Sequence, residues 1–233
     1  KAISSAAVKA DHIDAKVLAN LARLDFLPIA YAAPKEIRDL RMYVRHRDQL
    51  VRMRTQVKNR IHAVLASYNL ASPVSDLYGI EGREYLEDIM RTKLRPAAKK
   101  VIQDQLLLID QLSEQIEAIK TEIPLTPEQT QMVRLLKTVP GIGKVTANTI
   151  MAEIGDINRF HSAKALCNWA GLTPKIHSRD EIGRRGRISK QGSSLLRGAM
   201  TRAATVASRS SKRWYVVHEN LAPRCGKKAA KVA

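Results

Sequence analysis

Aromatic residues are scarce in this chain, at 4% of its 233 residues. Large aromatic side chains contribute much of the buried area of thick cores, so their scarcity argues against large compact domains and favours long helices. Only two cysteines occur, Cys167 and Cys225. Two are too few for a disulfide framework, and their spacing matches no zinc site. We therefore expect both to be free thiols in a reducing compartment.

Long apolar runs and acidic residues are in short supply as well. No stretch approaches the roughly 18 consecutive apolar residues of a membrane-spanning helix, and no lipid-anchoring pattern is found, so we expect a cytoplasmic protein without membrane contact. The 22 Asp and Glu face 40 Lys and Arg, which gives a formal net charge of +18. Such an excess predicts a polyanionic partner, above all a nucleic acid. A merely basic soluble protein, or one that touches acidic lipid, is the alternative.

Helical periodicity is what the chain has in abundance, and it starts with an amphipathic pattern at residues 7–27. Asp11 and Asp14 are three positions apart there, and so share one face of the helix. Two carboxylates at that spacing can hold a divalent metal such as Mg²⁺. They can also stabilise the start of the helix against its dipole, which is the reading that spacing alone favours.

A longer helix is predicted from Pro34 to about Leu70. Its apolar positions fall near heptad spacing: Ile37, Leu40, Val44, Val51, Val57, Ile61 and Val64. Nine Lys and Arg line the same segment against three acids. This imbalance suggests phosphate contact, with Arg45 and Arg52 as candidates, and a solvated charged face is the alternative.

The stretch at 72–82 is rich in Pro, Gly and Ser and indicates a turn. A second long helix is predicted from Pro96 to about Glu122. Its isoleucines recur every seven residues, with an intervening apolar row: Ile102, Ile109, Ile116 and Ile123, then Leu112 and Ile119. This is a coiled-coil seam, either within one chain or between chains.

Two short helices are predicted at 126–137 and 144–154, joined by Val-Pro-Gly-Ile-Gly at 139–143. The arrangement resembles the helix-hairpin-helix motif of DNA repair and recombination proteins, in which backbone N–H groups meet a phosphate. Gly141, Gly143 and Lys144 are the candidate contacts. A plain tight turn is the alternative.

The segment that follows is strongly basic. Ser162 is a plausible N-cap for a helix through Ala170, and Gly171 stands where a left-handed cap is wanted. Residues 175–213 hold eleven Lys and Arg against two acids, and a helix is predicted from Ser193 to about Ser208. The candidate phosphate contacts are Arg184, Arg185, Arg187, Lys190 and Arg197.

Four sequences in order carry a specific resemblance: Lys-Ala-Asp-His-Ile-Asp-Ala at 9–15, the glycine turn at 139–143, Gly-Leu-Thr-Pro at 171–174 and Gly-Arg-Ile-Ser-Lys-Gln-Gly at 186–192. Together they resemble the insertion-sequence transposases with a DEDD, RuvC-like domain, which include the Piv-type invertases and bridge-RNA-guided recombinases. The resemblance implies a mainly α chain with three parts. Residues 1–30 would end an α/β RuvC-like domain, 31–125 form a dimerising coiled coil, and 126–233 form a helical transposase domain with the helix-hairpin-helix motif. DNA, a structured guide RNA and further copies in a homodimer or homotetramer are the implied partners.

The same resemblance assigns roles to single residues. Asp11 and Asp14 match the last two acids of the DEDD metal set, with Mg²⁺ as the expected ion. The first two acids belong to a segment absent from this sequence. We expect both ends of this sequence to be cut from a longer protein. Ser178 matches the nucleophilic serine, although Arg179 and Asp180 stand where relatives commonly carry glycine. His177 beside it is a tempting but poorly placed base, because neighbours in sequence usually point apart.

The expected function is therefore that of an enzyme, a DNA transposase or site-specific recombinase that uses Ser178 and a metal. Two alternatives stay open from the sequence. One is a non-catalytic nucleic-acid-binding module, and the other is a RuvC-like junction nuclease in which only the acids and their metal do chemistry.

Overall fold

The computed structural model describes residues 11–26, 31–179 and 182–232, and the chain divides into two units, Lys1–Pro34 and Lys35–Ala233. In the first unit, helix α1 runs over Asp11–Arg23 and buries none of its residues. It covers most of the predicted 7–27 helix, whose ends lie outside the described residues. Asp25, with φ of 54°, follows the last turn, where the Phe26 N–H donates to the Leu21 carbonyl over 2.9 Å.

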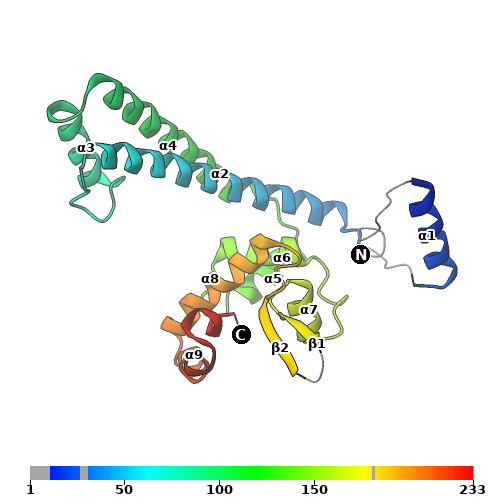
Figure 1. The fold of residues 1–233 in the computed structure, drawn as a ribbon. Helices are drawn as coiled ribbons and strands as arrows, with labels where there is room; N and C mark the ends of the chain where they lie inside the picture. Colours follow the sequence, from blue (N-terminus) through cyan, green and yellow to red (C-terminus); the bar gives the residue numbers. More distant parts are fainter. Residues whose placement is uncertain (1–10, 27–30, 180–181, 233) are drawn as a thin grey trace. The chain divides into compact units, whose positions relative to one another are not determined.

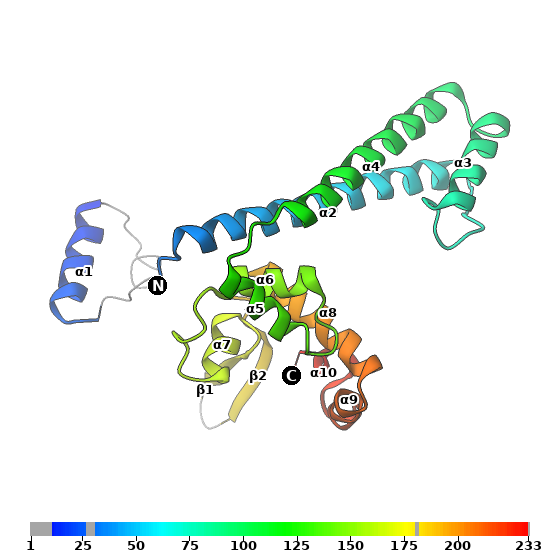
Figure 2. The ribbon, with the colours of Figure 1, turned by 180° about the vertical axis from the view of Figure 1, so that it is seen from behind.

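Two long helices dominate the start of the second unit. Helix α2 (Lys35–Ser67) and helix α4 (Pro96–Glu122) lie side by side in both views, with α3 (Ile80–Thr92) at the end where they are joined (Figures 1 and 2). Pro96 occupies the first turn of α4, where its missing N–H leaves no bond unmade. The boundaries of α4 match the predicted ones.

The isoleucine seam is buried within this single chain. Ile102, Ile109 and Ile116 are at most 3% exposed and belong to one apolar cluster with α2 residues. The buried partners on α2 are Leu50, Val57, Ile61 and Leu65. Leu50 and Leu65 replace the predicted Val51 and Val64, which are only partly buried, because the α2 stripe is shifted by one residue at those turns. The seam therefore closes a hairpin rather than requiring a second copy.

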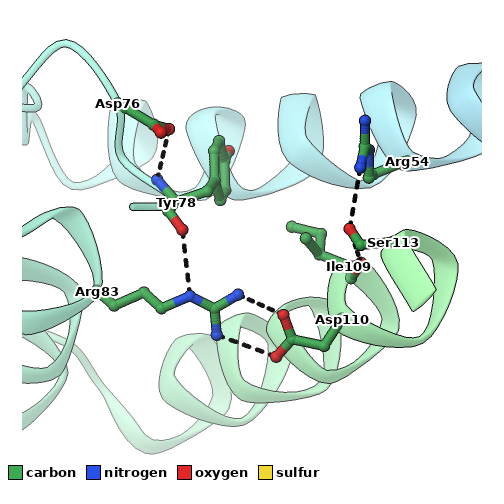
Figure 3. Close-up of polar contacts among 7 residues, drawn as sticks. All are labelled: Arg54, Asp76, Tyr78, Arg83, Ile109, Asp110 and Ser113. Atoms are coloured by element: carbon green, nitrogen blue, oxygen red, sulfur yellow. Dashed lines mark hydrogen bonds and ion pairs between the residues drawn. The ribbon is translucent and has the colours of Figure 1, made fainter. Parts of the chain in front are cut away.

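Helix α3 was not predicted, since glycine and proline nearby indicated a turn over 72–82. The turn ends at Gly79, which precedes α3, and Gly82 lies inside the helix. A Cβ atom on Gly82 would stand 2.3 Å from the Leu77 carbonyl carbon, so glycine serves close packing there. Figure 3 shows polar contacts between these helices: the Arg83 guanidinium of α3 forms two bonds to the Asp110 carboxylate, and farther along the hairpin Arg54 donates to Ser113 Oγ over 3.0 Å.

The rest of the second unit is a small helical body, which we call the C-terminal body (residues 126–232). Its elements are α5 (Pro127–Leu136), α6 (Lys144–Ile154), α7 (Ala163–Trp169), β1 (Pro174–Arg179), β2 (Ile182–Ile188), α8 (Ser194–Ser210), α9 (Lys212–Cys225) and α10 (Lys227–Ala230). Residues 147–154 of α6 are all buried, and α6 contacts α2, α5 and α8. It is thus the central helix that joins hairpin and body.

The predicted fold class is confirmed at the level of a mainly α chain, with ten helices and one two-stranded antiparallel sheet among the described residues. The predicted N-caps are confirmed as well. Ser162 Oγ accepts a hydrogen bond from the Ala165 N–H, and Ser193 Oγ accepts one from the Leu196 N–H. Cys167 and Cys225 are both free thiols. Within the described ranges, no helix has the length and apolar character needed to cross a bilayer.

Candidate functional site

The Gly-Leu-Thr-Pro sequence closes helix α7 and starts strand β1. Ala170 ends the helix, and the next residue, Gly171, adopts φ of +72°. The Leu172 N–H donates to the Cys167 carbonyl and the Gly171 N–H to the Asn168 carbonyl, which together form a Schellman motif. The left-handed cap predicted at Gly171 is therefore confirmed.

Two of the sequence motifs meet at this glycine. A Cβ atom on Gly171 would lie 2.1 Å from the Gln191 carbonyl oxygen, and one on Gly192 would lie 2.3 Å from the Trp169 carbonyl oxygen. The Ser189 N–H also donates to the Thr173 carbonyl over 2.9 Å. Backbone packs directly on backbone, which only glycine permits. We call this contact between residues 169–173 and 189–192 the motif junction.

Arg197 of α8 ties the motif junction together. Its Nη1 atom lies 2.7 Å from the Gln191 carbonyl oxygen, 3.0 Å from that of Gly192 and 3.1 Å from that of Ala170. Arg197 was predicted from the sequence as a phosphate contact. The structure places this nitrogen among backbone carbonyls of the chain itself, so Arg197 positions the loop that carries the other candidates.

The motif junction supports a β-hairpin that contains Ser178. Strands β1 and β2 are antiparallel, with Ser178 paired to Gly183, His177 to Arg184 and Ile176 to Arg185. The sequence pattern did not predict these strands, because their residues are basic rather than alternately apolar. The register brings the backbone of Ser178 beside that of the predicted arginines. Arg187 and Lys190, farther along, are exposed.

The candidate metal ligands lie in the first unit. Asp11 and Asp14 both occupy the first turn of α1, Asp11 exposed and Asp14 half-buried. Over the part of the chain that the structure describes, no third His, Cys, Asp or Glu joins them to form a cluster. The pair fits the oxygen ligands that Mg²⁺ prefers, and Mg²⁺ commonly uses only one or two protein carboxylates beside water and phosphate.

The glycine turn between α5 and α6 has two unlike glycines. Gly141, with φ of +87°, packs on α8, where an added Cβ would lie 2.3 Å from the Ala203 carbonyl oxygen. Gly143 caps α6, is exposed, and an added Cβ there would meet nothing within 4 Å. The turn thus leaves the backbone open at Gly143 and Lys144 and fixes it at Gly141.

Several of the basic side chains along α2 have partners inside the chain. Arg45 forms two hydrogen bonds to the carboxylate of Glu153 on α6, over 2.8 and 3.0 Å. Arg41 donates to the Ala152 and Glu153 carbonyls at the end of α6. Arg52 pairs with Asp48 one turn before it, over 2.7 Å. The bonds of Arg41 and Arg45 attach α2 to the C-terminal body, a role that sequence alone did not indicate.

Glu153 is a residue that the sequence pattern did not single out. Its side chain is 2% exposed, in the last turn of α6, where residues 150–154 are otherwise apolar. Burial favours a raised pKa, but hydrogen bonds from Arg45 and Ser193 and the charges of Arg45 and Arg41 outweigh it, so the pKa of Glu153 lies below its usual value. A lone acid in an apolar helix is the signal that could have revealed the pair.

Comparison with known proteins places both units among transposases. The family model described as Transposase IS116/IS110/IS902 family matches residues 133–218, and the DEDD transposase model of the IS110 group matches residues 1–70. The transposase for insertion sequence element IS1111A of Coxiella burnetii is 26% identical over 204 residues, which cover 88% of this chain and 56% of that protein.

Two further relatives agree. A probable family 20 transposase of Pseudomonas aeruginosa is 25% identical over 211 residues, covering 86% of this chain and 60% of that protein. A pilin gene-inverting protein of Moraxella bovis is 40% identical over 101 residues, covering 43% of this chain and 30% of that protein. The chain spans little more than half the length of the two transposases.

Proposed function

Because the chain belongs to the IS116/IS110/IS902 transposase family, a family of enzymes, we propose that it acts in DNA transposition or site-specific recombination through a serine nucleophile and an acidic site for a divalent metal. We also retain the three-part division, with the metal carboxylates before residue 31, the coiled coil at 31–125 and the serine domain at 126–233.

The observation that carries this proposal is the motif junction with the β-hairpin built on it. Three sequences that resemble transposase motifs lie within the residues matched by the family model, and two of them are locked together by backbone contacts and by Arg197. A lock of this kind keeps a catalytic loop in one geometry. It supports the assignment of Ser178 as the group that the loop presents to DNA.

The chemistry suits a serine in basic surroundings. Ser178 Oγ would attack the phosphorus of a phosphodiester, forming an O–P bond while the bond to one sugar oxygen breaks. The serine proton passes to a base or water, and the departing sugar oxygen takes up a proton. The covalent link conserves the phosphodiester for resealing to another strand. Arg184, Arg185, Arg187 and Lys190 would offset the charge that gathers on the phosphoryl oxygens.

Asp11 and Asp14 would hold the divalent metal, expected to be Mg²⁺, together with ligands from other residues or from the phosphate. When bound, such an ion lowers the pKa of a coordinated hydroxyl and stabilises negative charge on oxygen. The carboxylates of α1 contribute by binding the ion. Asp11 is exposed and Asp14 is half-buried, in a helix that buries none of its residues.

The partners follow from charge and family. A net charge of +18 suits a protein that handles DNA and, as we propose, a structured guide RNA. A homodimer or homotetramer is also proposed, because strand exchange requires two cuts. The isoleucine seam is used within the chain, so contacts between copies would need other surfaces, such as the exposed Val101 and Leu107 on α4.

Strand exchange by two variants tests this proposal, in a protein that supplies all four acids of the DEDD set. Ser178→Ala should retain DNA binding and lose strand exchange, because a hydroxyl adds little to binding already made by several cations. Ser210→Ala, at an exposed serine near the end of α8, is the matched control and should remain active. Asp11→Asn should fold and be inactive, since a metal ligand loses its charge.

The alternatives give different patterns. DNA cleavage that survives Ser178→Ala but not Asp11→Asn would replace the proposal with a metal-dependent nuclease. DNA binding with no cleavage or strand exchange by the unaltered protein would replace it with a binding module.

A further inference from the structure

Helix α9 buries none of its 14 residues, although it packs on α8 and α10. Both views place it beside the end of α8 (Figures 1 and 2). Four consecutive large apolar side chains of α9 are between 40% and 53% exposed: Trp214, Tyr215, Val216 and Val217. An apolar patch that stays open to water is typical of a surface that binds a partner.

A cavity of about 220 Å³ lies between α8 and α9. Its lining combines the aromatic ring of Trp214, which is also 40% exposed, with the side chain of Lys231. Helix α8 contributes mainly small side chains to the lining: Ala203, Ala204, Ala207 and Ser208. The cavity is therefore an apolar hollow with an aromatic wall that reaches the surface and a cation beside it.

This cavity is separate from the phosphate contact predicted at the glycine turn. The turn contributes only apolar side chains to the lining, those of Val139, Pro140 and Ile142. Gly143 and Lys144, whose backbone N–H groups were the predicted phosphate donors, line a different hollow, on the side of α2. A ligand beside Trp214 would consequently meet other groups than those of the helix-hairpin-helix motif.

The surroundings of the cavity are strongly basic. Residues 209–231 hold seven Lys and Arg against one acid, Glu219. The Arg213 guanidinium carbon lies 5.6 Å from the centre of the Trp214 ring. Among the described residues, the ion pairs use neither Arg213 nor Lys231. These cations favour a polyanion, and they disfavour a second copy of a chain whose net charge is +18.

An exposed aromatic ring among cations suits one class of polyanion in particular. The bases of a duplex stack on one another, whereas an unpaired base has free faces that stack on aromatic side chains. Trp214 offers such a face, and the apolar cavity beside it removes a base from water. Arg213 and Lys231 lie where phosphates on either side of that base can be neutralised.

We propose that Trp214 and the cavity beside it bind an unpaired base of single-stranded DNA, with Arg213 and Lys231 contacting the neighbouring phosphates. The inference rests on the proposed function for the choice of DNA, because breaking and exchanging strands leaves bases unpaired near the cut. It adds to that function a site on α9 that holds a strand after it has left the duplex.

Binding of short fluorescent oligonucleotides to the 233-residue chain, measured by anisotropy at constant salt, tests this site. The probes are a DNA strand of about 12 nucleotides, a length that single-strand binding sites cover, the same strand without its bases, its duplex, and an RNA strand of the same sequence. Trp214→Ala should weaken binding of the DNA strand about tenfold, as expected for the loss of one stacked base. It should leave binding of the duplex and of the base-free strand unchanged.

Tyr215→Ala is the matched control, because it removes an aromatic ring from the next position of α9, which is 53% exposed and lies outside the cavity lining. It should leave single-strand binding unchanged, and Trp214→Phe should retain most of it. Ala204→Leu fills the cavity from a half-buried position and should weaken single-strand binding as Trp214→Ala does. Circular dichroism checks the fold, and if Ala204→Leu fails to fold, the comparison of Trp214→Ala with Tyr215→Ala decides alone.

Several outcomes would overturn the inference. Equal effects of Trp214→Ala and Tyr215→Ala, or an equal loss of affinity for the base-free strand, would show that no base stacks on Trp214. A Trp214 dependence for RNA but not for DNA would overturn the choice of DNA. A lower mass of Trp214→Ala in light scattering, with unchanged single-strand binding, would show that this face joins copies of the chain.

These results are independent of the proposed recombinase function. Loss of the inference in the binding assay would leave strand exchange through Ser178 untouched. Conversely, if strand exchange fails, single-strand DNA binding that depends on Trp214 would still support the site on α9.

Discussion

The hairpin helix α2 and the segment at 171–192 are both basic, yet they use their charges differently. On α2, Arg45 forms two bonds to the buried Glu153, and Arg41 bonds to the end of α6. On the second segment the backbone is tightly held by glycine contacts, and Arg187 and Lys190 are exposed. Charge density alone therefore does not locate an interface. A cation that is bonded within the chain stabilises the fold, whereas an exposed cation can contact DNA.

The largest expected effect tests the role of the hairpin as a scaffold. Replacing Ile109 and Ile116 together with Asp puts two unpaired charges into a seam where the side chains are 3% and 1% exposed. The free energy of unfolding should fall by about 5 kcal/mol or more. Urea denaturation followed by circular dichroism measures it. Leu107→Asp, at a 61% exposed position of the same helix, should change it by less than about 0.5 kcal/mol.

The next effect concerns the motif junction. Gly171→Ala would place a methyl group 2.1 Å from a backbone oxygen at a residue with φ of +72°. The strain should lower the free energy of unfolding by about 2 to 4 kcal/mol. Gly143→Ala is the control, because φ is −90° and the position is open. Equal stability of the two variants would show that the junction is not rigid.

A smaller effect is expected at the contact between α2 and α6. Glu153→Gln removes the charge that Arg45 binds, and should cost about 1 to 2 kcal/mol, because Arg45 is partly exposed and can be hydrated instead. Because the pKa of Glu153 is lower in the folded chain than its usual value of 4.5, its contribution is present above about pH 4.5 and is lost as pH falls through the folded-state pKa.

The unfolding free energy of Glu153→Gln should accordingly change less between about pH 6 and pH 3 than that of the unaltered chain. Glu114→Gln, which removes an acid from an exposed position of α4, serves as the control. A pH dependence that Glu153→Gln leaves unaltered would contradict the role of the Arg45 pair.

The smallest expected effect concerns the salt dependence of DNA binding, which should differ between variants of the two basic regions. Replacing Arg184, Arg185 and Arg187 with Ala should reduce the slope of log affinity for duplex DNA against log salt by up to about 0.9 for each phosphate that is no longer neutralised. Replacing Arg45 and Arg52 should reduce it less, because both are paired with acids in the chain. A larger reduction from the α2 pair would reverse our assignment of scaffold and interface.

How far the sequence predicted this molecule depended on the kind of interaction involved. Helices with regular apolar spacing or strong caps, such as α4 and α5, were predicted nearly to the residue, because local periodicity and capping define them. Helix α3 was missed because Gly82 indicates a turn unless its close packing on Leu77 is known. The β-hairpin was missed because its strands are basic and lie on a backbone junction between segments about 20 residues apart along the chain.

The site followed the same rule. The sequence identified Gly171 as a helix cap but not its contact with Gln191. The roles of Arg45, Arg197 and Glu153 depend on partners outside their own turn of helix. No local pattern distinguishes an arginine that donates to backbone carbonyls, as Arg197 does, from one that is available to bind a phosphate. The roles of Ser178, Asp11 and Asp14 remain predictions from the family resemblance.

Mapping of a covalent adduct tests the central claim most directly. A protein that contains all four DEDD acids is incubated with its DNA substrate and Mg²⁺, quenched by denaturation, digested and analysed by mass spectrometry. Our account predicts a nucleotide attached to the peptide that contains Ser178, and no adduct in the Ser178→Ala variant. DNA cleavage with no protein adduct, or an adduct on another residue such as Ser189, would contradict it.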